Sequence, residues 1–251
     1  MSTPSLRTEG LGKRWGAFDA NRNVNLVLHP GARHALIGPN GAGKTTLINL
    51  LTGALPPTAG RVLLGDEDIT LLPQHLRVRR GMTRTFQITT LFAGLTVLES
   101  VLLAICERKG LQNRMLRSVA SHREEIDEAM ALLSMLKLAD AAALPTRTLP
   151  YGRQRLVEIA LALATRPKVL LLDEPAAGIP SAESAQLFEA IAALPRDVSI
   201  LFIEHDMNLV FRFAERITVM AGGEILCEGT PQEIAADRRV REVYLGEAEH
   251  A

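Results

Sequence analysis

The stretch Gly38-Pro-Asn-Gly-Ala-Gly43-Lys44-Thr45 decides the fold of this chain of 251 residues. It fits the pattern GxxxxGK[ST], follows a short apolar run at 35–38 that is typical of a strand, and opens a segment at 43–51 that is typical of a helix. Glycines between a strand and a helix let the backbone curl until its N–H groups point inward at phosphate oxygens. The pattern therefore predicts a nucleotide-binding loop.

Both the backbone and the side chains of this loop are expected to contribute. Lys44 would neutralise the β- and γ-phosphates, and the hydroxyl of Thr45 is placed to hold Mg²⁺. The residues that we expect to bind the nucleotide here are Gly38, Pro39, Asn40, Gly41, Ala42, Gly43, Lys44, Thr45 and Thr46.

A second stretch, Val169-Leu-Leu-Leu-Asp173-Glu174, supplies two carboxylates. Its continuous apolar run is typical of a strand that is buried on both faces of a parallel sheet. Asp173, at the end of that strand, would reach Mg²⁺ through water, and Glu174 would accept a proton from a water that attacks the γ-phosphate. Together with the glycine-rich loop, this pair predicts hydrolysis of a nucleoside triphosphate.

The composition excludes several other classes of protein. Hydrophobic residues make up 47% and charged residues 22%, which is ordinary globular usage and excludes a disordered chain. The 28 Lys and Arg residues equal the 28 Asp and Glu residues, so no overall basic field favours sequence-independent nucleic-acid binding. Cys106 and Cys227 form no zinc motif, and no run approaches the roughly 18 apolar residues that span a bilayer. We expect a soluble intracellular protein.

The rest of the sequence alternates between strand and helix patterns, except in one segment. Residues 24–28 alternate apolar and polar side chains, as in a half-buried strand. Between about 88 and 165 only helical patterns occur. We therefore predict an α/β core formed by residues 1–87 and 166–251, into which a helical subdomain of residues 88–165 is inserted.

Four further features make the chain resemble the ATP-binding subunits of ABC transporters over its whole length. Leu149-Pro-Tyr-Gly-Arg-Gln154 stands before a helix, where the signature sequence of that family lies. Gln87 occupies the place of the Q-loop glutamine, His205 that of the switch histidine, and Trp15 that of the aromatic residue that stacks on adenine. The resemblance implies a P-loop NTPase core of ABC-ATPase type, with an N-terminal antiparallel β subdomain and an inserted α-helical subdomain.

The resemblance also implies a dimer. Two ATPase subunits would face each other head to tail, and each ATP would be clamped between one phosphate loop and the signature of the partner subunit. Tyr151, Gly152 and Arg153 would then contact the nucleotide of the partner through the N-terminus of a helix.

Three side chains receive further roles from the resemblance. Gln87 would sense the γ-phosphate and the metal ion and pass this state to the helical subdomain. His205 would bind the γ-phosphate and orient the water and Glu174. Trp15 would contact adenine, although Phe18 is a nearby rival for that contact.

The chain departs from the family pattern at two positions. Pro150 replaces the serine of the signature, and Pro180 replaces the aspartate of the D-loop that follows the two carboxylates. Proline has neither a hydroxyl nor an N–H group. The contacts that the family makes across the dimer at these two points are therefore in question.

Several phrases resemble one branch of the family, the ATPases of branched-chain amino acid importers. These phrases are His34-Ala-Leu-Ile-Gly-Pro-Asn-Gly41, Arg84-Thr-Phe-Gln87, Leu91-Phe-Ala-Gly-Leu-Thr-Val97, Asp173-Glu-Pro-Ala-Ala-Gly178, Ile203-Glu-His-Asp-Met207 and Tyr244-Leu-Gly-Glu247. The branch implies a peripheral protein at the cytoplasmic face of the membrane. Its partners would be permease subunits, a second ATPase subunit in a homo- or heterodimer and, indirectly, a periplasmic or extracellular solute-binding protein.

Other functions remain open at this point. The importer could carry urea, amides, aromatic acids or another small solute. A soluble ABC ATPase that acts on nucleic acid would need long coiled-coil arms or two cassettes, so we expect no nucleic-acid partner; the cluster of Arg77, Arg79, Arg80 and Arg84 is interpreted as a solvated face. A nucleotide-binding subunit with little hydrolysis is the second alternative.

Overall fold

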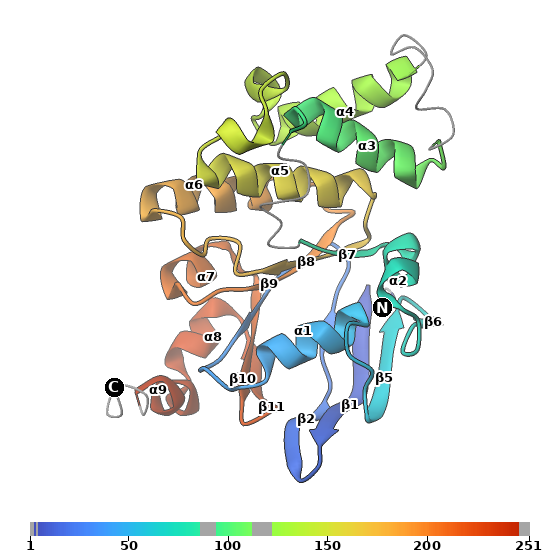
Figure 1. The fold of residues 1–251 in the computed structure, drawn as a ribbon. Coiled ribbons are helices and arrows are strands. Elements are labelled where there is room, and N and C mark those ends of the chain that lie inside the picture. Colours follow the sequence, from blue (N-terminus) through green and yellow to red (C-terminus); the bar gives the residue numbers. More distant parts are fainter. Residues whose placement is uncertain (1–2, 4, 86–93, 112–121, 246–251) are drawn as a thin grey trace. The chain divides into compact units, whose positions relative to one another are not determined.

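The computed structural model describes residues 3, 5–85, 94–111 and 122–245 (Figure 1). Its contacts divide the chain into two compact units, one of residues 1–84, 168–175 and 195–251 and one of residues 85–167 and 176–194. The second unit therefore includes residues 176–194, which the sequence analysis assigned to the core.

The first unit contains an antiparallel sheet, as the resemblance implied. The strands run in the order β2-β1-β5-β6, and β3 also pairs with β1. The strands are β1 (Leu6–Trp15), β2 (Phe18–Val24), β3 (Val27–Leu28), β5 (Ala59–Leu64) and β6 (Glu67–Asp68). The single strand expected at 24–28 is interrupted: β2 ends at Val24 and β3 begins at Val27, and both pair antiparallel with β1.

A second, mainly parallel sheet lies in the same unit. Its strand order is β11-β10-β4-β9-β8-β7, and only β11 runs antiparallel to its neighbour. The strands are β4 (Arg33–Ile37), β7 (Met82–Arg84), β8 (Val169–Asp173), β9 (Ser199–Ile203), β10 (Arg216–Ala221) and β11 (Glu224–Gly229). Because β4, β8 and β9 are parallel neighbours, the segments that follow them emerge at one edge of the sheet.

Helix α1 (Lys44–Thr52) belongs to the core that the two sheets of this unit share. Its Leu47, Ile48, Leu50 and Leu51 are fully buried among side chains of both sheets. Each such side chain stabilises the fold by about 1.5–3 kcal/mol. The phosphate loop, which leads into α1, is thereby anchored to both sheets.

The remaining helices of the first unit are short. They are α2 (Gln74–Arg80), α7 (Met207–Phe213), α8 (Pro231–Ala236) and α9 (Arg238–Leu245). Helix α8 begins with a capping box formed by Thr230 and Glu233. Within the described ranges, no helix is both long enough and apolar enough to cross a membrane.

The interpretation of the arginine cluster as a solvated face is wrong for Arg77. Its side chain is fully buried and donates to the carbonyl oxygens of Leu50 and Leu51 at 2.8 and 2.5 Å, in the last turn of α1. The last carbonyls of a helix lack the usual N–H partner four residues on, so a buried cation supplies donors to them; the Leu50 carbonyl also accepts from the N–H of the C-cap residue Gly53 at 3.3 Å. Burial lowers the pKa of Arg77 to about 10. Arg79 and Arg80 are exposed, as expected.

The second unit is helical where it is described. It comprises α3 (Val97–Arg108), α4 (Arg123–Met135), α5 (Tyr151–Ala164) and α6 (Ser181–Ala192), with single 3₁₀ turns at Ala139–Ala141 and Thr146–Thr148. Helices α3, α4 and α5 pack against one another, and α5 also contacts α6. An isolated bridge between Thr96 and Pro145 is the sole β pairing in the described part of this unit. The prediction of an inserted helical segment is therefore confirmed.

Candidate nucleotide site

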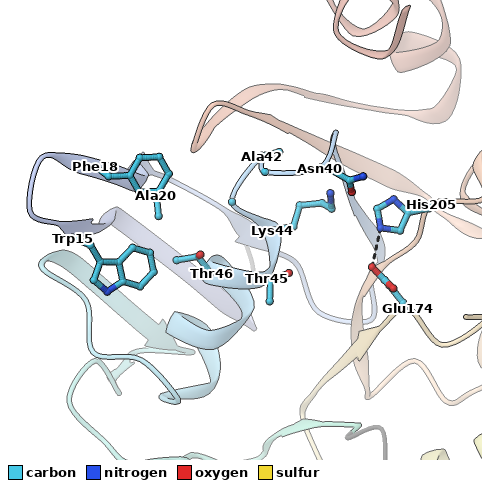
Figure 2. A pocket seen from close by; sticks show the side chains of 12 residues that line it. Trp15, Phe18, Ala20, Asn40, Ala42, Lys44, Thr45, Thr46, Glu174 and His205 are labelled. Carbon is cyan, nitrogen blue, oxygen red and sulfur yellow. Dashed lines mark hydrogen bonds and ion pairs between the residues drawn. The ribbon is translucent and has the colours of Figure 1, made fainter. Parts of the chain in front are cut away.

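A pocket of about 270 Å³ opens where the antiparallel and parallel sheets of the first unit meet the phosphate loop (Figure 2). Its lining comes from the β1–β2 hairpin, from the loop and from the segments that follow β8 and β9. The lining residues are Trp15, Phe18, Ala20, Asn40, Gly41, Ala42, Gly43, Lys44, Thr45, Thr46, Glu174 and His205.

The phosphate loop ends in a helix N-terminus that faces this pocket. Gly43 precedes α1 with φ +96°, and a Cβ atom there would lie 2.5 Å from the carbonyl oxygen of Ala20, so this position admits only glycine. The first N–H groups of a helix lack intrahelical partners and bind anions. Lys44 adds a buried cation, whose Nζ donates to the carbonyl oxygens of Gly38 and Pro39 at 2.6 and 2.9 Å.

Glu174 and His205 stand together at one end of the pocket (Figure 2). Nε2 of His205 lies 2.8 Å from Oε1 of Glu174, within hydrogen-bond distance. The backbone of Glu174 is left-handed, with φ +48°, and its N–H donates to the carbonyl oxygen of Ile203 at 3.1 Å. Such a conformation costs a non-glycine residue about 1–3 kcal/mol, and it occurs most often at functional sites. Parallel pairing of β8 with β9 thus places a histidine and a carboxylate side by side.

Asp173, the last residue of β8, is engaged by a partner that the sequence analysis did not identify. Arg84, at the end of the neighbouring strand β7, forms an ion pair with Asp173 and also donates to Oδ1 of Asn49 at 3.0 Å. Arg84 is therefore no part of a solvated face. No local pattern could reveal this pair, because it depends on which strand becomes the neighbour of β8.

Two aromatic side chains form the other end of the pocket (Figure 2). Trp15 and Phe18 are cross-strand partners at the tip of the β1–β2 hairpin and are 47% and 65% exposed. Nζ of Lys13 lies 5.6 Å from the centre of the Trp15 ring. Trp15 is therefore no core residue, and both rings are available to stack on a base.

The signature residues lie in the second unit, at the start of α5. Pro150 is the N-cap of this helix, and Tyr151, Gly152 and Arg153 follow it. Tyr151 accepts a hydrogen bond from Arg155 at 2.5 Å, and Arg153 pairs with Asp140 at 2.5 Å. Their side chains thus have partners within their own unit, and their predicted contact with a nucleotide stays a prediction.

Two of the metal-site predictions fall on described residues and one does not. Thr45 lines the pocket, and Asp173 is the last residue of β8. Gln87 lies outside the described residues. Their hydroxyl, carboxylate and amide oxygens are the kind of ligand that Mg²⁺ prefers. Among the described residues, no three His, Cys, Asp or Glu side chains form a metal-binding cluster.

Two family comparisons agree with this geometry. Residues 21–177, more than half of the chain, match the family described as "ABC transporter". Residues 224–250 match the family described as "Branched-chain amino acid ATP-binding cassette transporter".

Curated relatives match over almost the whole chain. The high-affinity branched-chain amino acid transport ATP-binding protein LivG of Escherichia coli K12 is 43% identical, with 99% of this chain and 100% of LivG covered. The protein BraF of Pseudomonas aeruginosa, which carries the same description, is 40% identical with the same coverage.

Solved structures with the same fold are ATP-binding cassettes. The ADP conformation of MJ1267, an ATP-binding cassette of an ABC transporter, superposes with a TM-score of 0.85 at 32% identity and covers 98% of this chain and 100% of that one. The dimeric structure of the bacterial cassette MJ0796 superposes with a TM-score of 0.73 at 27% identity, with 90% and 98% covered.

Proposed function

This chain belongs to the family of ABC transporter ATP-binding subunits, and from that premise we propose that it hydrolyses ATP to power an importer of branched-chain or related amino acids. The observation that carries the proposal is one pocket that joins an aromatic end, a phosphate loop and a Glu174–His205 pair, in a chain similar over nearly its full length to LivG. We also propose that the α/β core binds the nucleotide and that the helical subdomain carries the signature.

The pocket orients ATP from the base to the γ-phosphate. Adenine stacks on Trp15 or Phe18, the loop N–H groups and Lys44 bind the phosphates, and the γ-phosphate reaches the end that holds Glu174 and His205. In this orientation the aromatic end of the pocket binds the base, and the end with Glu174 and His205 faces the γ-phosphate (Figure 2).

Hydrolysis requires that a water be deprotonated as it attacks the γ-phosphate. The carboxylate of Glu174 accepts that proton, and His205 holds the carboxylate in place through the 2.8 Å contact. A general base of this kind contributes about 10²–10⁴-fold to the rate. Mg²⁺, held by Thr45, Asp173 and Gln87, supplies charge neutralisation at the phosphates when it is bound.

The partners complete the proposal. A second ATPase subunit places its signature on this ATP, permease subunits dock this chain at the cytoplasmic face of the membrane, and a solute-binding protein delivers the solute. Among the relatives, the names of LivG and BraF support the amino-acid substrate. Urea, amides and aromatic acids are the competing solutes.

The decisive experiment purifies the tagged chain from membranes of its own organism and identifies the co-purifying proteins by mass spectrometry. We expect two permease subunits and a second ATPase subunit, and ATPase activity in proteoliposomes that rises with the binding protein and leucine but not with urea. Stimulation by urea alone would reject the amino-acid part. Turnover that responds to nucleic acid, in the absence of any permease, would reject the importer role.

A further inference from the structure

We propose that the turn between β10 and β11, through Gly223, acts together with Asn21 on β2 to hold the phosphate loop in its binding conformation. Gly223 and Asn21 are then positioning residues for nucleotide binding, although neither belongs to the loop. The inference rests on the proposed function, because it concerns how the same site holds phosphates.

Hydrogen bonds from outside the loop reach two successive loop carbonyl groups. The N–H of Gly223 donates to the carbonyl oxygen of Ala42 at 3.1 Å, and Nδ2 of Asn21 donates to the carbonyl oxygen of Gly43 at 3.2 Å. The carbonyl oxygen of Gly223 in turn accepts from the N–H of Arg22 at 2.9 Å, which ties the turn to β2 (Figure 1). Loop, turn and β2 therefore form one connected set of bonds.

The planarity of the peptide bond converts these contacts into a direction for the loop N–H groups. In a trans peptide, the C=O of one residue and the N–H of the next point in opposite directions. A bond that draws the Ala42 carbonyl toward the turn thus aims the N–H of Gly43 the other way. The Gly43 carbonyl accepts from the N–H of Leu47 at 2.9 Å as well as from Asn21, so the bond from Asn21 adds to the hold of the helix on the N–H of Lys44. Gly43 and Lys44 both line the pocket, where an anion needs these donors.

The packing leaves this part of the loop little freedom. Asn21 is 1% exposed and Ala42 is 2% exposed. Gly223 is buried with φ +82°, and a Cβ atom on it would lie 2.8 Å from the carbonyl oxygen of Ala20. A side chain at position 223 would therefore push the turn away from β2 and break its bond to Ala42.

The chain provides its own control for this effect. Gly222, the preceding residue, also has a left-handed backbone with φ +56°, but it is exposed and has no atom within 4 Å of its Cβ position. Alanine at either position imposes left-handed strain on the same turn. Only alanine at 223 also displaces the bond to the loop.

The test measures the Kd for ATP, with Mg²⁺ present, by calorimetry on the full chain, and the Tm without nucleotide. Gly223→Ala should raise the Kd about tenfold, because the bond from the N–H of residue 223 to the Ala42 carbonyl is lost and the N–H of Gly43 is no longer aimed at the phosphate; tenfold is about the net contribution of one hydrogen bond. Gly222→Ala should lower the Tm as well but change the Kd less than about twofold. Asn21→Ala should raise the Kd about three- to tenfold.

Equal Kd values for Gly223→Ala and Gly222→Ala, whatever their Tm values, would overturn the proposal. The turn would then contribute to the stability of the fold but not to nucleotide binding. If Gly223→Ala does not fold, Asn21→Ala decides, and an unchanged Kd for that variant overturns the proposal. Failure of the unmodified chain to bind ATP is a different result, because it contradicts the proposed function itself.

Discussion

The phosphate-loop end of the first unit and the start of α5 in the second unit differ in whether their polar side chains line a pocket. Around the loop, the charged and polar side chains line a pocket, where Lys44, Glu174 and His205 lie together. At the start of α5, the side chains of Tyr151 and Arg153 bind residues of their own unit.

This difference indicates which chemical groups, side chains or backbone N–H groups, each region can offer to a ligand. The loop region contains a carboxylate and a cation in one pocket, the groups on which the proposed reaction depends. The side chains at the start of α5 are paired within their own unit, so we expect any contribution to a partner to come from the backbone of the first turn, at the positive end of the helix dipole.

Glu174→Gln should produce the largest effect, on the region that carries the reaction. Glutamine keeps the size of the side chain but cannot accept the proton, so ATPase activity of the assembled transporter should fall about 10²–10⁴-fold. The Kd for ATP should stay within about twofold, because the loop N–H groups and Lys44 are untouched. Glu67→Gln, at an exposed carboxylate paired with Arg80, is the control and should change neither quantity. Near-normal turnover by Glu174→Gln would contradict its assignment as the base.

Gly152→Asp tests whether the start of α5 acts through its backbone. A Cβ atom at position 152 would lie 2.7 Å from Oε2 of Glu183, so any side chain there displaces Glu183. A carboxylate would in addition oppose the phosphate of the partner's nucleotide, and two charges about 4 Å apart near a protein surface repel by about 4 kcal/mol. We expect ATPase activity of the assembled transporter to fall about a hundredfold or more, while the isolated chain binds ATP normally. Gly152→Ala is the control, because it brings the same Cβ atom against Glu183 without the charge. Full activity of Gly152→Asp would show that this signature has no part in hydrolysis.

The same contrast decides how much could be predicted from the sequence. The loop, β4 and β8 were predictable because their signals are local: a glycine pattern, and apolar runs of strand length. Arg77 was not, because its burial depends on carbonyl groups at the end of α1, which the chain brings together only on folding. The ion pair of Arg84 with Asp173 was missed for the same reason.

Strand β1 shows a second limit of sequence reasoning. It contains Gly10 and Gly12, and its pairings with β2 and β5 shift register near those glycines. Bulges of this kind break the alternation by which a strand is recognised. The capping box at Thr230 and Glu233, by contrast, is a local device, and its residues are readable in the sequence as Thr230-Pro-Gln-Glu233.

Mild acid tests the support beneath the phosphate loop. His34 of β4 is 1% exposed, and its Nε2 lies 2.8 Å from Oγ1 of Thr218, which donates to Glu228. Burial lowers the pKa of His34 from 6.5 to about 4, against a smaller opposing effect of Glu228 and a reinforcing one of Arg216. The unfolded chain therefore takes up a proton on His34 at a higher pH than the folded chain does.

The stability that rests on the neutral imidazole is present above pH 6.5 and is lost as the pH falls toward 4. The expected loss is about 3 kcal/mol. Urea unfolding between pH 7.5 and 4.5 measures it, and the His34→Gln variant, which cannot titrate, should show a flatter curve in this window. Parallel curves for the two proteins would mean that folding does not lower the pKa of His34.

Pro150→Ser should have the smallest effect on the fold. Pro150 caps α5 with φ −53° and ψ 150° and provides no side-chain cap. Serine would add a helix cap that stabilises the fold by about 0.5–2 kcal/mol. It would also remove the stabilisation of about 0.4–1 kcal/mol that proline provides by restricting the unfolded chain. The free energy of unfolding should therefore change by about −0.5 to +1.6 kcal/mol. The new hydroxyl would also reach the partner's γ-phosphate, so the ATP-bound dimer should tighten about tenfold.

Pro180→Ser separates the cap from the contact. Pro180 caps α6 with almost the same backbone, φ −57° and ψ 144°, and likewise has no side-chain cap. Serine there adds the same cap, but it does not restore the aspartate that the family carries at this point. Both variants should shift the midpoint of urea unfolding by the same amount. In sedimentation with ATP, with both variants made in a chain that also carries Glu174→Gln, only Pro150→Ser should raise the dimer fraction. Equal dimer fractions for the two variants would mean that the signature serine acts only as a helix cap.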